Sequence, residues 1–149
     1  MGMAIIITSK NPNPSLYDMP HASFDFSGEM EYCDLPLQYW SLGDYYTQWI
    51  QALTRVRDQL LPAALITSIF DSDVAANVVA WVMFPLADGV VAIQQRIVLR
   101  NKLFGQGNAI DYDMLRTRET ADEDGNTVSE WIVNMDDVSD VIDNLQYMA

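Results

Sequence analysis

The spacing of apolar residues changes at Pro62, and this change constrains the fold more than any other feature of the chain. Before Pro62 the spacing predicts a helix over residues 42–60, with Ser41 as its N-cap and Asp44 completing an S-x-x-D capping box. The helix must end before Pro62, because proline lacks a backbone N–H and clashes with the preceding turn. Its apolar residues recur at helical intervals and form one stripe: Tyr45, Trp49, Ala52, Leu53, Val56 and Leu60.

Beyond Pro62 the apolar pattern is typical of β-strands. Two almost wholly apolar runs, 63–70 and 77–86, are followed by the turn residues 71–73 and by Asp88-Gly89, which is a hairpin signal. Residues 90–100 then alternate, which predicts a strand with one buried and one solvated face. The expected buried face holds Val91, Ile93, Ile97 and Leu99, and the expected solvated face holds Gln94, Arg96 and Arg100.

The flanking segments predict short elements. Residues 3–8, 23–27 and 29–33 read as strands, and 101–108 as a loop. Residues 115–120 and 127–133 predict a second hairpin around a turn at 122–126, and 136–145 predict a short final helix. The order predicts the α+β class and a single domain over residues 1–149. We expect a largely antiparallel β-sheet, a meander, covered by one long helix, with a short C-terminal helix.

The chain is strongly acidic, with 21 Asp and Glu against 8 Lys and Arg and a formal net charge of -13. Such a chain repels nucleic-acid phosphates and anionic membrane surfaces, so we expect it to bind neither directly. A basic protein partner fits better, because opposite charges speed encounter at low salt. The charge can equally serve only to keep the chain soluble, and composition does not decide between these readings.

Cysteine usage and hydropathy indicate the compartment. The single cysteine, Cys33, excludes an internal disulfide and a multi-cysteine zinc site, which fits a reducing environment. The sequence shows neither a signal-peptide pattern nor a run of about eighteen apolar residues that could span a membrane. We therefore expect a cytoplasmic protein, and the oligomeric state stays open.

Residue types that carry catalysis are sparse. His21 is the only histidine, and Cys33 beside Asp34 lacks the neighbouring cation that would activate its thiol. The 122–126 segment lacks the ligand spacing of an EF-hand, and no phosphate-binding loop occurs. We expect no enzyme, no metal and no cofactor. A carboxylate-based hydrolase stays open as an alternative, because paired acids can cleave glycosides without histidine.

The acids are concentrated toward the C-terminus. Residues 111–143 contain eleven acids and two arginines, a formal balance of −9. If the second hairpin and the last helix adjoin, these acids form one anionic surface; otherwise the charge is scattered. The residues expected to bind a protein partner are acids of this segment: Asp111, Asp113, Asp122, Glu123, Asp124, Asp136, Asp137 and Asp140.

Several stretches spread over most of the chain carry a resemblance. They are PSLYDMP at 14–20, ASFDFSGE at 22–29, LPLQYWS at 35–41, YTQW at 46–49, ALITS at 64–68, RET at 118–120, EDG at 123–125 and SEW at 129–131. Together they resemble the CdiI-type immunity proteins of bacterial contact-dependent growth inhibition systems. None of these stretches has a catalytic signature.

The resemblance implies a cytoplasmic protein that binds the toxic C-terminal domain of a cognate effector, often a nuclease, and blocks its active site or substrate-binding surface. This agrees with the charge, because a nuclease needs a basic surface to hold phosphates and an acidic protein can occupy that surface. An acidic interaction module with another partner, such as an adaptor or a chaperone, is the alternative.

Overall fold

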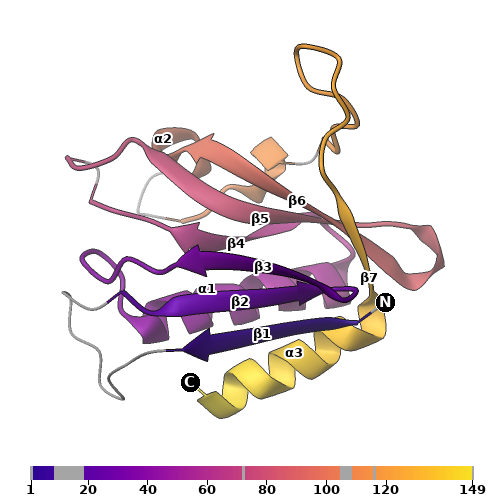
Figure 1. Ribbon diagram of the computed structural model, residues 1–149, viewed down its shortest axis with the longest axis horizontal. Helices are drawn as coiled ribbons and strands as arrows, with labels where there is room; N and C mark the ends of the chain where they lie inside the picture. The colour runs from indigo at the N-terminus through magenta and orange to yellow at the C-terminus, as the bar shows by residue number, and fades with distance from the viewer. Residues whose placement is uncertain (1, 9–18, 72, 105–108, 116, 149) are drawn as a thin grey trace.

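The strands form two antiparallel sheets, each a simple meander (Figure 1). The computed structural model describes residues 2–8, 19–71, 73–104, 109–115 and 117–148. The first sheet has the order β1-β2-β3, with β1 (Met3–Thr8), β2 (His21–Phe26) and β3 (Glu29–Asp34). The second has the order β4-β5-β6-β7, with β4 (Ala63–Ser68), β5 (Asn77–Pro85), β6 (Val90–Leu99) and β7 (Trp131–Asn134).

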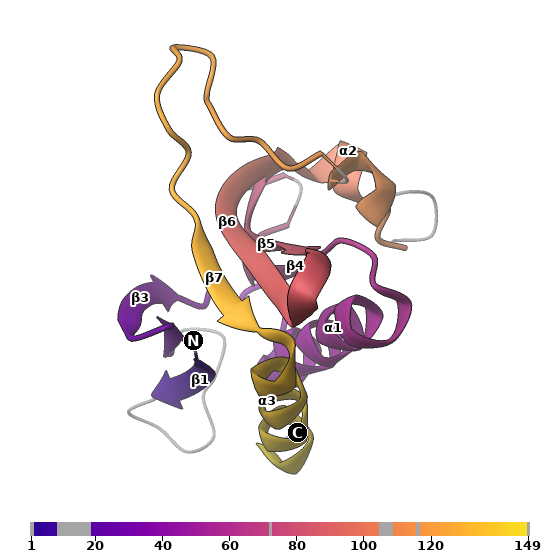
Figure 2. The same cartoon turned by 90° about the vertical axis from the view of Figure 1, so that its right-hand side faces the viewer.

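The long helix α1 (Leu42–Thr54) continues into a π-helical turn, η1 (Arg55–Gln59), and the chain ends in α3 (Met135–Met148). Short helical turns are η2 (Ala87–Gly89), α2 (Arg100–Leu103) and η4 (Tyr112–Leu115). In Figure 2 the three-stranded sheet lies on one side of the molecule and α1 on the other, with α3 below. The expected α+β class is confirmed, with the strands divided between two sheets.

The predicted start of α1 is confirmed. The Ser41 hydroxyl accepts a hydrogen bond from the Asp44 backbone N–H at 3.2 Å, and the Asp44 carboxylate accepts one from the Ser41 N–H at 2.9 Å. The predicted stripe is buried except for Leu60, whose assignment to the stripe was wrong. Leu60 is exposed and has a φ of +53°, because the chain leaves the helix there in a left-handed turn just before Pro62.

Two side chains of α1 cover the open edge of β4, which is the end strand of its sheet. The Gln48 amide donates to the Ala64 carbonyl at 2.7 Å and accepts from the Ile66 N–H at 2.9 Å, as a neighbouring strand would. The Trp49 indole N–H donates to the Ile66 carbonyl at 2.7 Å. The helix therefore satisfies backbone groups that an exposed edge strand would leave open.

An aromatic cluster joins the two sheets and α1. Phe24 lies 5.8 Å from both Trp49 and Trp81, measured between ring centroids, and Phe26 lies 5.2 Å from Trp81. Trp131 of β7 extends the cluster, at 5.5 Å from Trp81. Aromatic rings at these separations add to the stabilisation from burial, so one core holds both sheets.

The predicted alternation of β6 holds only in its first half. Val91 and Ile93 are buried as expected, whereas Ile97 and Leu99 are exposed and Gln94 is fully buried. The predicted solvated face is covered because residues 117–119 and 130 lie over Gln94 and Arg96, as their hydrogen bonds show. The alternation of residues within one strand does not show whether a segment distant in the sequence covers one of its faces.

The predictions of a second hairpin at 115–120 and 127–133 and of a loop at 101–108 were each partly wrong. The Asp88-Gly89 turn is confirmed, with φ of +66° and +72°, but residues 115–120 form no strand. Residues 131–134 pair with β6 instead, and Ala121 and Thr127 form an isolated bridge. Residues 101–103 of the expected loop belong to α2, which begins at Arg100, and 105–108 lie outside the described residues.

Candidate partner-binding surface

Residues 117–130, called the arm here, extend away from the rest of the molecule before β7 begins (Figures 1 and 2). Residues 117–127 are all exposed. Two backbone hydrogen bonds cross the arm near its tip, from the Asp122 N–H to the Asn126 carbonyl at 2.9 Å and from the Val128 N–H to the Thr120 carbonyl at 3.2 Å. The arm is therefore a polar segment that presents both its side chains and much of its backbone to solvent.

The buried Gln94 and an ion pair hold the root of the arm. The Gln94 amide donates to the Glu119 carbonyl at 2.6 Å and to the Glu130 carboxylate at 2.8 Å. Arg118 forms a bidentate ion pair with Glu130. The hydrogen bond from the Arg118 guanidinium is the main cause of a lowered pKa for the Glu130 carboxyl; burial opposes this lowering, and the Gln94 amide adds a smaller one. The root is therefore fixed by charge-assisted hydrogen bonds.

The tip of the arm contains three predicted contact residues with different roles. The Asp122 carboxylate accepts hydrogen bonds from the backbone N–H groups of Asp124 and Asn126, both at 2.9 Å, so it closes the tip's own turn. Gly125 has a φ of +81°, which the turn requires. Glu123 and Asp124 are exposed, so their carboxylates face solvent.

The other predicted acids lie elsewhere. Asp111 and Asp113 are at η4, where the Asp113 carboxylate is 3.7 Å from the Arg55 guanidinium. Asp136, Asp137 and Asp140 lie in the first turns of α3, where negative charge suits the helix dipole. Both views place α3 and the tip of the arm at opposite ends of the molecule. The eight acids therefore occupy three places along the molecule, and the structure does not bring them onto one continuous patch.

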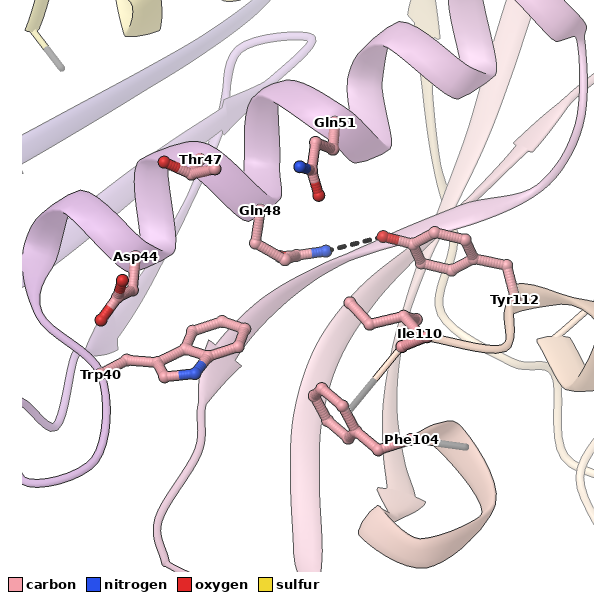
Figure 3. A pocket seen from close by; sticks show the side chains of 9 residues that line it. Trp40, Asp44, Thr47, Gln48, Gln51, Phe104, Ile110 and Tyr112 are labelled. Atoms are coloured by element: carbon pink, nitrogen blue, oxygen red, sulfur yellow. Dashed lines mark hydrogen bonds between the residues drawn. The ribbon is translucent and has the colours of Figure 1, made fainter. Parts of the chain in front are cut away.

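Sequence reasoning missed a groove of about 470 Å³ beside α1 (Figure 3). Gln48 and Gln51 line it from the helix, and Phe104 and Tyr112 line it from the segment after β6. The Gln48 amide donates to the Tyr112 hydroxyl at 3.0 Å, across 64 residues of sequence, and burial raises the pKa of Tyr112. No periodic pattern could find this groove, because its walls come from separate segments.

The residues considered for catalysis lie near one another on the first sheet. His21 and Asp34 are direct cross-strand partners, and the imidazole Nδ1 contacts the Asp34 carboxylate. Cys33 is half-buried one position before Asp34, with Thr67 as a side-chain hydrogen-bond partner. The pKa of the Cys33 thiol is raised to about 11, mainly by burial; the hydrogen bond with Thr67 opposes the rise and the nearby Asp34 carboxylate adds to it.

We expect Cys33 to react with iodoacetamide at pH 7.5 about a hundredfold more slowly than the same thiol in the urea-unfolded chain, because only the thiolate is nucleophilic. Mass spectrometry of the alkylated protein measures both rates. Stability should also fall as the pH rises from 9.0 toward 11, because the folded chain holds this proton more tightly than the unfolded chain. Equal alkylation rates would show that the thiol is not protected.

Carboxylate catalysis needs an acid whose pKa is raised. The carboxyl groups of Asp58 and Glu130 have lowered pKa values, because each is hydrogen-bonded to an arginine, Arg57 and Arg118 respectively.

Among the described residues no group of three or more His, Cys, Asp or Glu side chains is arranged to hold a metal ion. In the same part of the chain, no helix is both long and apolar enough to cross a membrane.

Comparison with known proteins gives consistent matches. A family model described as the CdiI N-terminal domain matches residues 35–141. The curated Immunity protein CdiI of Enterobacter cloacae subsp. cloacae is 26% identical over 111 residues, which are 74% of this chain and 76% of that protein. A chain of the CdiA-CT/CdiI toxin and immunity complex from Enterobacter cloacae shares the fold, with a TM-score of 0.75 and 23% identity over 96% of this chain and 99% of that chain.

The fold and these matches place the chain in the class of toxin-immunity proteins. Within that class it belongs to the CdiI N-terminal domain family, whose model covers most of its length. Family membership confirms the resemblance seen in the sequence. It also confirms the expectation that the chain is not an enzyme, because CdiI immunity proteins are inhibitors.

Proposed function

We propose that this chain binds the C-terminal toxin domain of a cognate contact-dependent growth inhibition effector in the cytoplasm, and neutralises it by covering its active site or substrate-binding surface. The arm is the observation that carries the proposal. It combines an exposed acidic tip with a root held by the buried Gln94 and by the Arg118–Glu130 ion pair, an arrangement suited to presenting charge to a partner. The relative named Immunity protein CdiI and the structure titled a toxin and immunity complex support a toxin as that partner.

The charge of the chain favours a basic toxin, and a nuclease is the class that best fits this requirement. An enzyme that cleaves nucleic acid holds phosphates on a positive surface. A protein with a formal net charge of -13 can compete for that surface, and its own charge keeps it from binding the nucleic acid. Occlusion of the substrate surface then needs no catalytic group and no cofactor in the immunity protein.

The proposed contact residues follow from the three positions of the acids. Glu123 and Asp124 at the tip of the arm would meet the toxin first, with Asp122 keeping the tip in shape. Asp111 and Asp113 belong to the segment just before the arm and would add to the negative electrostatic potential near it. Asp136, Asp137 and Asp140 on α3 would contribute only to the long-range field of a toxin seated at the arm.

A growth experiment tests the proposal in cells. The toxin domain is taken from the secreted effector whose gene lies beside that of this chain, and it is expressed from an inducible promoter with or without this chain. We expect growth to stop without this chain and to continue with it, and an unrelated toxin domain should not be neutralised. If the cognate domain is equally toxic in both cases, the chain does not act as its immunity protein.

A further inference from the structure

The outer face of the three-stranded sheet is unusual in its residue types. In an antiparallel pair, residues in register lie on the same face, and every second residue returns to it. The register places Ile6, Ser23 and Tyr32 in one row across the sheet. Ala4, Asp25 and Met30 form a second row on the same face, and Thr8, His21 and Asp34 form a third, polar row at its other end.

This outer face exposes large apolar side chains where a solvated sheet face would carry polar ones. Tyr32 is 68% exposed, Ile6 is 55% exposed and Met30 is 40% exposed. The opposite face holds Phe24 and Phe26, which are fully buried in the core. The exposed residues are therefore not needed to hold the sheet onto the molecule. Clustered exposed apolar side chains of this kind mark interaction sites.

The described helices and strands leave this face open. In Figure 2 the sheet forms one side of the molecule, with α1 on the other side and α3 below. The face therefore lies on the side away from the long helix. The arm is on the same side of α1 in this view, above the sheet.

The fixed charges on this face are acidic. β1, β2, β3 and the turn between β2 and β3 contain neither lysine nor arginine. Of their four acids, Asp25 and Asp34 lie on the outer face, where Asp34 contacts His21, and Glu29 and Glu31 are in register with Phe26 and Phe24 on the opposite face. An apolar centre with a charged rim is the usual anatomy of a protein–protein interface. The charge of this rim is complementary to a basic partner.

The sheet is also tied to the arm. The Trp131 indole N–H donates to the Glu29 carboxylate at 2.6 Å, and the Ser27 hydroxyl donates to the Ile132 carbonyl. Trp131 and Ile132 begin β7, the strand into which the arm runs. A partner that contacts the arm can therefore meet the sheet in a fixed geometry.

We propose that the outer face of the three-stranded sheet is the surface on which the basic toxin domain docks, with Tyr32 as its anchor. The proposal rests on the proposed function and goes beyond it by naming the face. The arm steers the toxin by charge, and the row containing Ile6 and Tyr32 holds it by burial. Binding energy concentrates on such aromatic residues at the centre of an interface, whereas rim charges act mainly on the association rate.

A second copy of this chain is a poorer occupant of the face. A two-fold dimer brings the same surface of each copy together, so the acids around the face would meet one another. The formal net charge of -13 adds long-range repulsion between copies. A basic partner meets neither obstacle.

Two pairs of variants test this docking surface in binding measurements with the purified cognate toxin domain. Tyr32→Ala is compared with Tyr147→Ala, because Tyr147 is 93% exposed on α3, away from the face. Ile6→Lys is compared with Ile97→Lys, because Ile97 is 72% exposed on a strand of the other sheet. All four positions are exposed, so thermal melts should show that every variant folds.

We expect Tyr32→Ala and Ile6→Lys each to raise the Kd at least tenfold, and the two controls to change it less than threefold. Unchanged affinity in both Tyr32→Ala and Ile6→Lys, with tight binding by the unmodified chain, overturns the docking face and leaves the proposed function intact. Equal losses in the controls overturn it too, because the effect would then not belong to this face. Absence of binding by the unmodified chain overturns both proposals.

Discussion

The Gln48→Glu variant is expected to lose about 2–4 kcal/mol of unfolding free energy, because it removes a buried donor at the edge of β4. The Gln48 amide N–H group donates to the Ala64 carbonyl and to the Tyr112 hydroxyl, and the amide oxygen accepts from Ile66. A carboxylate keeps the bond from Ile66 but faces the Ala64 carbonyl with a second acceptor. Urea unfolding at pH 7 measures the loss.

Gln51, three residues further along the same helix, supplies a matched control because it is exposed. The Gln51→Glu variant has the same change in charge and should lose less than about 0.5 kcal/mol. The difference between the two variants should also depend on pH. Burial raises the pKa of a carboxyl at position 48, so the folded variant holds its proton more tightly and the deficit grows from about pH 4 toward neutral pH. Equal stability of the two variants at pH 7 would show that Gln48 does not support the edge strand.

The double variant Glu123→Lys with Asp124→Lys is expected to slow association with the toxin domain at least tenfold in low salt. Both residues are exposed at the tip of the arm, and reversing them turns attraction for a basic partner into repulsion. The difference from the unmodified chain should shrink as salt rises, because the Debye length falls. Stopped-flow measurements at several salt concentrations give the rates. Asp122 is left intact because its carboxylate closes the turn.

The control for the arm is the double variant Asp140→Lys with Asp143→Lys on α3, which changes the net charge by the same amount. If only the net charge of the chain mattered, the two double variants would slow association with the toxin domain by the same factor. A larger effect of the arm variant assigns the steering to the arm, and a larger effect of the α3 variant would assign it to the first turns of that helix. Both variants should melt as the unmodified chain does, since all four positions are exposed.

Sequence reasoning was most accurate where structure is decided by neighbours along the chain. The capping box at Ser41 and Asp44 and the hairpin turn at Asp88 and Gly89 are confirmed, because a cap and a tight turn depend on a few consecutive residues. Within each meander neighbouring strands also follow one another in sequence, apart from β7, and β2–β3 and β5–β6 are joined by short turns.

The misses have a tertiary cause. Gln94 was expected on a solvated face and is buried, because the root of the arm lies over it and uses its amide. The strand expected at 115–120 is absent because β7 pairs with β6 instead of with that segment. The acids predicted as contacts are exposed or half-exposed, but their grouping into three places depends on the path of the chain between η4, the arm and α3.

The candidate surfaces illustrate the same limit. The rim acids could be named from composition, because acidic side chains are usually exposed. The row of Ile6, Ser23 and Tyr32 could not be named, because it needs the register of three strands and knowledge of which face the core occupies. The groove beside α1 likewise needs contacts between Gln48 and Tyr112 that no local pattern reports.

Calorimetric titration of the purified cognate toxin domain with this chain measures whether the chain captures that domain. We predict a 1:1 complex with a Kd in the nanomolar range, which corresponds to a binding free energy of about −12 kcal/mol. The affinity should fall as the salt concentration is raised. Loss of the toxin's activity in the titrated sample should follow the same stoichiometry. No heat of binding, together with full toxin activity at equimolar protein, would show that the chain does not neutralise this toxin.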